Sequence, residues 1–208
     1  MEFFSIELIA FTLFDYPISY IELIGTLFGL LSVILASRAN ILTWPTGIIN
    51  EAFFLLLFFQ VQLYADMLLQ VYFFVMTLYG WFYWNSDKKE HRIGVVSTRN
   101  RLTIILLLLM GTVVCGFVIS RLHVYLSDVF VEPAAFPYID SFTTVASIIA
   151  MVLLARKRLE AWVLWIAVDI VSVCLYVTKG INLIAMEYLV FLAIATYGFF
   201  HWKSKIED

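Results

Sequence analysis

Carboxylate and amide side chains interrupt stretches of this 208-residue chain that are otherwise apolar. Asn50 and Glu51 lie within one such stretch, Asp169 lies within another and Glu187 within a third. A charged group at the centre of a bilayer costs at least about 2.5 kcal/mol, so a buried acid there needs a partner, a proton or a water-filled cavity. Carboxylates and amides bind cations and hydroxyl groups, which makes these positions candidates for holding a small polar solute.

Two helical stripes of polar and aromatic side chains accompany these acids. The first stripe recurs at steps of four, three and four residues, which places it on one helix face; its members are Asp66, Gln70, Phe73 and Thr77. The second recurs at steps of three and four; its members are Trp162, Trp165, Asp169, Ser172 and Tyr176. Aromatic rings stack on flat solutes and attract cations. An aromatic stripe is equally typical of core packing, so both interpretations of the second stripe stay open.

The sequence lacks the side-chain groupings of an enzyme or a metal site. The three histidines lie in loops or at the end of an apolar stretch; they are His91, His123 and His201. Cys115 and Cys174 lie within apolar stretches, where cysteine behaves as a small hydrophobic residue. We therefore expect no enzyme activity, no catalytic residue, no bound metal and no cofactor.

The composition predicts that these side chains are positioned by membrane-spanning helices. Hydrophobic residues make up 63% of the chain, charged residues 14%, and the mean hydropathy is +0.95, far from the usual composition of soluble domains. Lipid-exposed backbone must satisfy its own hydrogen bonds, so each apolar stretch is predicted to be helical. An all-α polytopic membrane protein is expected, with seven spans at residues 19–37, 41–59, 63–84, 102–121, 139–155, 161–178 and 181–202.

The basic residues predict the orientation of the spans. When the seven spans alternate, 11 of the 13 Lys and Arg residues fall on one side, so the N-terminus is expected outside and the C-terminus in the cytoplasm. The first 17 residues contain no Lys or Arg, so we expect no signal peptide. Residues 3–14 are too short an apolar run to span a bilayer, and a helix at the interface or packed on the bundle is the prediction there.

An internal repeat organises the chain. Arg38 recurs as Arg156 and Trp44 as Trp162, each 118 positions later, and the register holds without a gap from residue 20 to residue 86. Two parallel three-helix copies joined by one linker helix are predicted, an arrangement also found in the SWEET sugar carriers. The expected segments are an N-terminal interfacial segment (1–17), repeat 1 (18–86), a linker with the fourth helix (87–137), repeat 2 (138–204) and a cytoplasmic tail (205–208).

Four longer motifs carry a resemblance to a known family. They are WPTGIIN at 44–50, LYADMLLQVYF at 63–73, YGWFYW at 79–84 and RKRLEAWVLWIAVD at 156–169. These segments are similar to those of the PnuC family of bacterial nicotinamide riboside transporters. The resemblance implies a SWEET-like 3+1+3 fold in the bacterial inner membrane, facilitated diffusion with trapping by intracellular phosphorylation, and homo-oligomers, with a trimer as one form. Its partners would be the riboside and the lipid bilayer, with no nucleic acid.

The resemblance extends over essentially the whole chain from about residue 18, including AMEY at 185–188, and also implies a set of substrate-binding residues. They are Asn50, Tyr64, Asp66, Gln70, Trp165, Asp169, Asn182, Glu187 and Tyr188. A flat, cationic, hydroxylated solute would use the acids, rings and amides of this set together. Two alternatives stay open: a related vitamin such as thiamine as cargo, and a proton-coupled carrier that uses an intramembrane acid.

Overall fold

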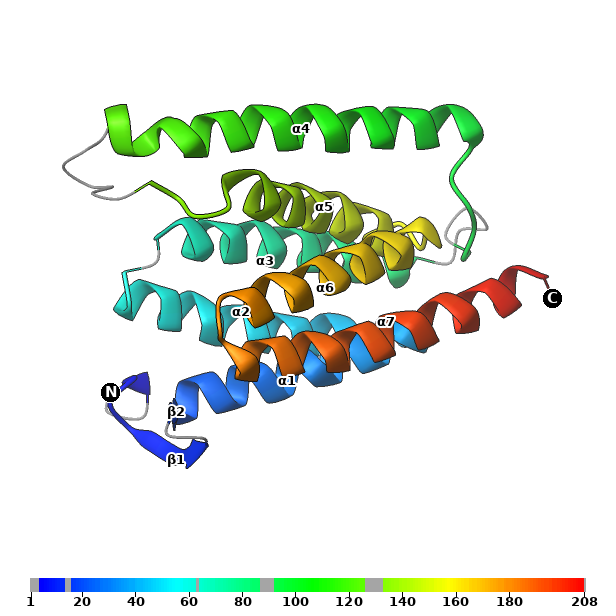
Figure 1. The fold of residues 1–208 in the computed structure, drawn as a ribbon. Helices are drawn as coiled ribbons and strands as arrows, with labels where there is room; N and C mark the ends of the chain where they lie inside the picture. The colour runs from blue at the N-terminus through cyan, green and yellow to red at the C-terminus, as the bar shows by residue number, and fades with distance from the viewer. Residues whose placement is uncertain (1–3, 14–15, 63, 87–91, 126–132, 208) are drawn as a thin grey trace. The chain divides into compact units, whose positions relative to one another are not determined.

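The fold is all-helical apart from one short hairpin. The computed structural model describes residues 4–13, 16–62, 64–86, 92–125 and 133–207, without the side chains of Tyr64, Ala65 and Asn182. Within these ranges lie the strands β1 (Ile9–Leu13) and β2 (Tyr16–Ser19) and the helices α1 (Tyr20–Ser37), α2 (Thr43–Gln60), α3 (Tyr64–Trp84), α4 (Thr98–Tyr125), α5 (Pro137–Ala155), α6 (Glu160–Thr178) and α7 (Asn182–Glu207). Each predicted span coincides with one of these helices, which confirms the seven helices (Figure 1).

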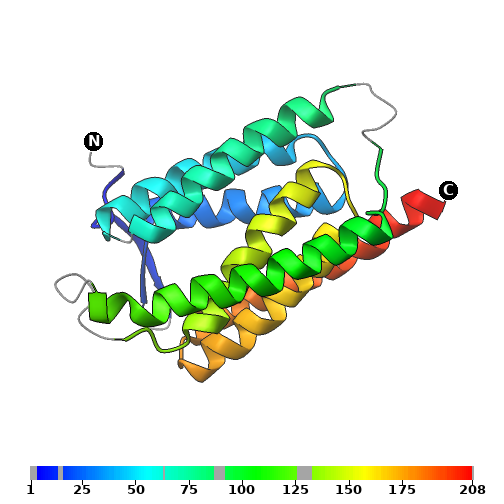
Figure 2. The ribbon, with the colours of Figure 1, turned by 90° about the horizontal axis from the view of Figure 1, so that it is seen from above.

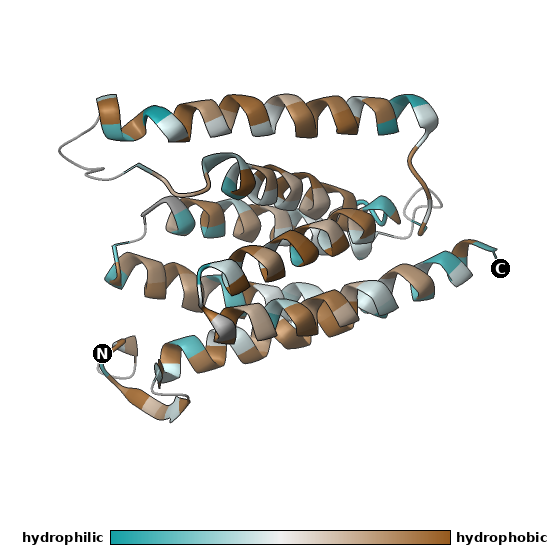
Figure 3. Cartoon of the chain, viewed as in Figure 1, coloured by the Kyte–Doolittle hydropathy of each residue, from teal (hydrophilic) through white to brown (hydrophobic). Residues whose placement is uncertain are grey.

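Six of the helices, α1 and α3 to α7, are long and apolar enough to cross a membrane. Helix α4 is apolar along its centre and polar at both ends (Figure 3). Helix α2 is long enough, with 18 residues, but Asn50, Glu51 and Gln60 interrupt its apolar sequence, and it is not among these six. The chain is therefore a multi-pass membrane protein.

The prediction of a helix at residues 3–14 is wrong, because Ile9–Leu13 form a strand of an antiparallel hairpin and residues 4–8 form no α-helix. Strand β1 pairs with β2, with Phe11 opposite Ile18 and Leu13 opposite Tyr16. The sequence of β1, IAFTL, is rich in β-branched and aromatic residues, which favour strands over helices. Periodicity alone cannot separate strand from helix in so short an apolar run.

The hairpin is fastened to the helices that follow it. The Gln60 amide at the end of α2 donates to the carbonyl of Phe4 (2.8 Å) and accepts from the N–H of Ile6 (3.1 Å). The Tyr16 hydroxyl donates to Glu22 in the first turn of α1 (3.2 Å). Burial and the Glu22 carboxylate raise the pKa of the Tyr16 phenol above its ordinary value, so the phenol keeps the proton that it donates.

The chain forms two compact units, of which the first comprises residues 1–92 and 200–208. In this unit α1 packs on α2 and α2 packs on α3. Trp44 of α2 is 2% exposed and lies so close to Gly80 of α3 that a side chain at Gly80 would meet its ring. Trp84 meets the edge of Trp44 at 5.1 Å, and the indole N–H of Trp202 donates to the carbonyl of Ala36 (3.1 Å). Tryptophans thus form the core of this unit.

The second unit comprises residues 93–199, in which α4 packs on α5 and α5 on α6. Figure 2 shows α5 crossing α4 at an angle. Gly111 and Gly116 let α4 approach Val145 and Tyr138 of α5, because a Cβ at either glycine would lie within 2.9 Å of those side chains. The rest of α4 is largely exposed and apolar, as expected of a helix that faces lipid.

Two backbone turns recur 118 residues apart. After α1, Ala39 has a φ of 54°, and after α5, Lys157 has a φ of 53°. After α2, Gln62 has a φ of 60°, and after α6, Gly180 has a φ of 75°. In each turn the N–H of the left-handed residue donates to the carbonyl three residues earlier, as in helix C-terminal caps. The same chain reversals therefore end the corresponding helices in the two parts of the sequence.

Candidate functional site

A polar cluster between α6 and α7 in the second unit contains the most buried of the predicted site residues. Asp169 is 3% exposed, and its Oδ2 has no hydrogen-bond partner among the described residues. One turn later along α6, the buried Ser172 hydrogen-bonds the hydroxyl of Tyr188 on α7, close to Asp169. The Tyr188 ring stacks on Tyr176 with 5.5 Å between the centroids and 13° between the planes. We call Asp169, Ser172, Tyr176 and Tyr188 the α6–α7 cluster.

The cluster combines the groups needed to bind a flat cation. An acid with an unused oxygen in apolar surroundings attracts a positive charge strongly, because the local dielectric constant is low. Parallel tyrosine rings offer faces on which a flat solute or a cation can lie. The sequence pattern pointed to this stripe of α6 but not to the pairing of Ser172 and Tyr176 with Tyr188, which depends on the packing of α7.

The other end of the α6 stripe serves packing. Trp162 is 1% exposed, and its ring lies where a Cβ at Gly198 of α7 would be, at 2.9 Å. Trp165, one turn further toward Asp169, is half-buried. The stripe therefore includes both proposed roles: core packing at Trp162 and polar contacts from Asp169 onward.

Two further predicted residues of the second unit lie on α7. Glu187 is half-buried and lies near enough to the Tyr188 hydroxyl to act on it electrostatically. Acidic charge from both α6 and α7 therefore surrounds that hydroxyl. The side chain of Asn182 lies outside the described residues.

Among the predicted residues of the first unit, Asn50 has a structural contact. Its amide nitrogen donates to the carbonyl of Gly25 on α1 (2.9 Å). A Cβ at Gly29 would lie 2.7 Å from the same nitrogen, so the small residue makes room for the amide. Asn50 thus joins α1 to α2, and any role in binding a solute would be additional.

Glu51, the neighbour of Asn50, also has a partner that the sequence pattern did not identify. It is 5% exposed, and its Oε1 accepts a hydrogen bond from the Thr77 hydroxyl of α3. Its Oε2 has no partner among the described residues. Thr77 belongs to the α3 stripe, and its hydroxyl is used in this contact with Glu51 within the first unit.

The remaining predicted residues lie along α3. Asp66 is exposed in the first turn and Gln70 is half-buried one turn later. The side chain of Tyr64 lies outside the described residues. Asn50, Asp66 and Gln70 thus belong to the first unit, and Trp165, Asp169, Glu187 and Tyr188 belong to the second. Among the described residues, no group of three or more His, Cys, Asp and Glu side chains could hold a metal ion.

Comparisons with known proteins agree with this architecture. The family model described as "Nicotinamide mononucleotide transporter" matches residues 19–204. The protein named nicotinamide riboside transporter PnuC from Escherichia coli (strain K12) is 32% identical over 234 residues, covering 100% of this chain and 97% of that protein. The chain belongs to the PnuC family of membrane transporters. Members of this family move solutes across membranes, so the protein is a transporter and not an enzyme.

Two further matches show the range of this similarity. The riboflavin/roseoflavin transporter RibM from Streptomyces davaonensis is 28% identical over 200 residues, covering 93% of this chain and 89% of that protein. The solved structure titled "Crystal structure of the Vitamin B3 transporter PnuC" is 21% identical and superposes with a TM-score of 0.67, covering 90% of this chain and 82% of that one. The fold is therefore shared, while the named cargoes of the relatives differ.

Proposed function

We propose that this protein takes up nicotinamide riboside by facilitated diffusion, and that phosphorylation inside the cell then traps the riboside. The α6–α7 cluster carries the proposal: a buried carboxylate, with an oxygen that is unpaired among the described residues, lies near Tyr188, whose ring stacks on Tyr176. The E. coli relative that carries the riboside name aligns with the whole of this chain. That match supports the same cargo.

The chemistry of nicotinamide riboside fits these groups. Its pyridinium ring is flat and positively charged, so Asp169 can neutralise it and the rings of Tyr176 and Tyr188 can lie against it. Its ribose and carboxamide need hydrogen-bonding groups, which Ser172 and Glu187 supply nearby. Binding needs no chemical step, so the protein only has to expose the site to each side in turn.

The charge of the site favours the riboside over nicotinamide mononucleotide, the solute in the name of the family model. The mononucleotide carries a phosphate group, with up to two negative charges. Residues 160–178 and 182–202, which form α6 and most of α7, contain Glu160, Asp169 and Glu187 but no Lys or Arg. Lys179, directly after α6, lies over the Tyr176 ring at 5.7 Å and pairs with Asp140. A phosphate beside Asp169 would face a carboxylate about three helical turns from that lysine, which costs binding energy.

The two three-helix segments are, in this proposal, parallel copies in a SWEET-like 3+1+3 arrangement with the boundaries predicted from the sequence. The recurring turns at Ala39 and Lys157 support the duplication. So do the two tryptophan–glycine contacts, one in each unit, between α2 and α3 and between α6 and α7. Parallel repeats of this kind are a transporter architecture in which the units rock about a shared site.

In this proposal helix α2 also crosses the membrane, which brings the number of spans to seven. Several of its polar side chains have partners within the first unit: Thr43 exchanges hydrogen bonds with Ser32 of α1 (2.8 and 2.9 Å), in addition to the contacts of Asn50 and of Glu51 Oε1. Paired polar groups lower the cost of crossing lipid. Seven spans place the N-terminus outside and the C-terminus in the cytoplasm of the bacterial inner membrane, which agrees with the distribution of basic residues. Homo-oligomers, with a trimer as one form, complete the proposal.

Two alternatives have specific observations in their favour. The similarity to the riboflavin transporter RibM favours a flavin, and thiamine is a cationic vitamin that an acid would also attract. The buried acids Glu51 and Asp169 would suit a proton-coupled carrier. A neutral flavin ring, however, would leave the Asp169 carboxylate without a counter-charge.

Calorimetry on the purified protein tests the cargo. Nicotinamide riboside, nicotinamide, nicotinamide mononucleotide, thiamine and riboflavin are titrated side by side into the wild type, the Asp169→Asn variant and the Asp140→Asn variant. Asp140 is a matched control, because it is a half-buried acid of the same unit that pairs with Lys179 at 3.8 Å. We expect the riboside to bind best and only Asp169→Asn to weaken it. Tight binding of riboflavin or thiamine without the riboside would contradict the assignment.

A further inference from the structure

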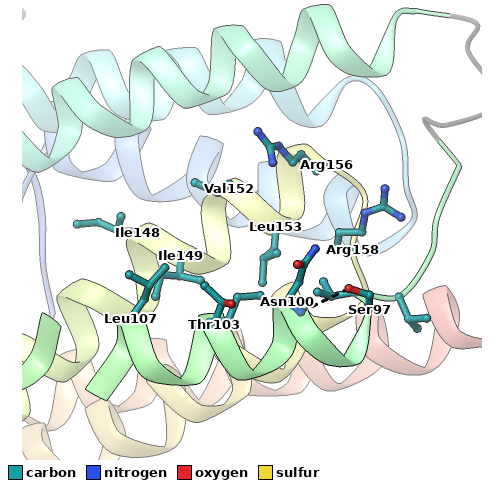
Figure 4. A pocket seen from close by; sticks show the side chains of 13 residues that line it. Ser97, Asn100, Thr103, Leu107, Ile148, Ile149, Val152, Leu153, Arg156 and Arg158 are labelled. Atoms are coloured by element: carbon teal, nitrogen blue, oxygen red, sulfur yellow. Dashed lines mark hydrogen bonds between the residues drawn. The ribbon is translucent and has the colours of Figure 1, made fainter. Parts of the chain in front are cut away.

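A pocket lies in the second unit, between α4 and α5 and beside the segment that leads into α4. It has a volume of about 520 Å³, which lies within the range of ligand sites. One part of its lining is polar and basic: Ser97 and Asn100 come from the start of α4, and Arg156 and Arg158 come from the turn after α5. Figure 4 shows Asn100 and Arg158 at the same end of this pocket. None of these residues belongs to the α6–α7 cluster.

The opposite part of the pocket is aliphatic. Leu107 of α4 and Ile148 and Ile149 of α5 line it, at the end away from Ser97 and Arg158 (Figure 4). Two to three helical turns separate the polar from the aliphatic lining along each helix, since each residue of a helix rises about 1.5 Å. The pocket therefore has a basic end and an aliphatic end, which suits a ligand with a negatively charged head group and an apolar tail.

Hydrogen bonds and an ion pair hold the segments that form the basic end of the pocket. Gly94 donates its N–H to the carbonyl of Lys157 (3.1 Å) and accepts from the N–H of Leu159 (2.9 Å). The Glu160 carboxylate accepts from the N–H of Val96 (3.0 Å) and forms an ion pair with Arg101 (2.9 Å). These bonds tie the segment before α4 to the turn between α5 and α6. Because these bonds fasten the segment on both sides, the backbone that carries the two arginines is held before any ligand arrives.

The pocket lies where α4 passes from polar to apolar sequence. The first turn of α4 reads TRNR, and the helix is then almost wholly apolar for four turns from Leu102. Helix α5 ends with a long apolar run at Ala155, directly before Arg156. This change marks the level of lipid head groups in a spanning helix. The basic end is thus at head-group level and the aliphatic end is in the hydrocarbon.

We propose that this pocket binds an anionic phospholipid. The phosphate of the lipid lies at Arg158 and Asn100, Arg156 adds positive charge to the same end of the pocket, and one acyl chain follows the groove between α4 and α5. Basic pockets between membrane helices are the typical receptors of anionic lipid head groups, and arginine binds phosphate through two parallel hydrogen bonds. A lipid held here would bridge α4 to α5, which otherwise meet through glycine contacts at Gly111 and Gly116.

The test uses full-length protein in a neutral detergent. Thermal unfolding and native mass spectrometry are recorded with phosphatidylglycerol, phosphatidylcholine and soluble glycerol 3-phosphate. The double variant R156Q/R158Q is compared with R99Q/K205Q, which removes the same charge from two exposed residues that do not line the pocket. A third variant, Leu107→Trp, fills the aliphatic end without a change of charge.

We expect phosphatidylglycerol alone to stabilise and co-purify with the wild type and with R99Q/K205Q. Two arginines near an anionic lipid contribute roughly twenty- to thirtyfold in affinity, so R156Q/R158Q should lose about that much, and Leu107→Trp should also weaken binding. Equal losses in R156Q/R158Q and R99Q/K205Q would overturn the proposal. So would stabilisation by glycerol 3-phosphate as strong as by the lipid, or cross-linking that places a second copy of the chain over the pocket. None of these readouts involves the transported cargo.

Discussion

Glu51 and Asp169 occupy corresponding positions 118 residues apart, yet their surroundings differ. Both are buried acids in the middle of a helix, at 5% and 3% exposure. Glu51 accepts a hydrogen bond from Thr77 of α3. The position corresponding to Thr77 is Ala195, which has no hydroxyl to donate. Asp169 instead lies near the hydroxyl of Tyr188, which Ser172 also contacts.

This difference indicates how a duplicated scaffold can acquire an asymmetric site. In the first unit the acid is held by a threonine and serves the packing of α2 on α3. In the second unit the same position keeps its acid without that threonine and is surrounded by aromatic and hydroxyl groups. We therefore expect Glu51 to contribute mainly to stability and Asp169 mainly to solute binding.

The largest expected effect concerns the two tryptophan–glycine contacts. A Cβ at Gly80 would lie 2.2 Å from the Trp44 ring, whereas one at Gly198 would lie 2.9 Å from the Trp162 ring. Gly80→Ala should therefore lower the free energy of unfolding by about 3 kcal/mol and Gly198→Ala by about 1 kcal/mol, since overpacking typically costs 1–3 kcal/mol. Denaturant unfolding in detergent measures both. Equal losses would mean that the two contacts are equally tight.

The next-largest expected effect is on riboside affinity, and it should differ between Asp169 and Glu51. Asp169→Asn removes a charge that faces the cation, so the affinity for nicotinamide riboside should fall by about 1.5–3 kcal/mol, or roughly ten- to a hundredfold. Glu51→Gln should change the affinity less than threefold, because that side chain is engaged by Thr77. Calorimetry with the riboside measures both variants. If Glu51→Gln weakened binding as much as Asp169→Asn, the proposed division of roles would be wrong.

A smaller effect comes from the threonine itself. Thr77→Ala leaves Glu51 without its donor and should lower the free energy of unfolding by about 1–3 kcal/mol. Ala195→Ser adds a hydroxyl to α7 at the position that corresponds to Thr77. This variant should change the free energy of unfolding little. Unfolding curves and riboside affinities of the two variants are compared. A drop in affinity without loss of stability in Thr77→Ala would assign Glu51 to the site.

The smallest effects are expected at single polar contacts. Tyr188→Phe removes the hydroxyl that meets Ser172, and Gln70→Ala removes a half-buried amide from the α3 stripe. Each should weaken riboside binding by about 1 kcal/mol, as the loss of one hydrogen bond typically does. Tyr176→Phe is the control for Tyr188→Phe, because it keeps the stacked ring. Unchanged affinity in both Tyr188→Phe and Gln70→Ala would place the solute elsewhere.

The long apolar runs and the internal repeat predicted the helices well. An apolar run of about 18 residues in a membrane must form a helix, because its backbone has no other hydrogen-bond partners. The turns at Ala39 and Lys157 have the same backbone form although the residues differ. The short run at the N-terminus gave no such guidance. There the structure is a hairpin because residues such as Phe11 and Ile18 pair across it, which the periodicity of the sequence does not show.

Side-chain partners were harder to predict than helices. The pattern identified Asn50 as a polar residue in an apolar span, but its bond to Gly25 depends on where α1 crosses α2. Likewise, the run RKR at 156–158 contributed to the predicted orientation, to the repeat and to the family resemblance, but not to any prediction of a pocket. Its place beside an aliphatic pocket depends on the packing of α4 against α5. Such contacts join residues that are distant in sequence, so no local pattern reports them.

Uptake into proteoliposomes tests the central claim most directly. Purified wild-type protein and the Asp169→Asn variant are reconstituted, and entry of labelled nicotinamide riboside is followed with and without an imposed proton gradient. We predict that the wild type equilibrates the riboside across the membrane without a gradient, that excess unlabelled riboside competes, and that Asp169→Asn is slower at low concentrations. A strict requirement for the gradient, or uptake of riboflavin or thiamine without uptake of the riboside, would contradict the account.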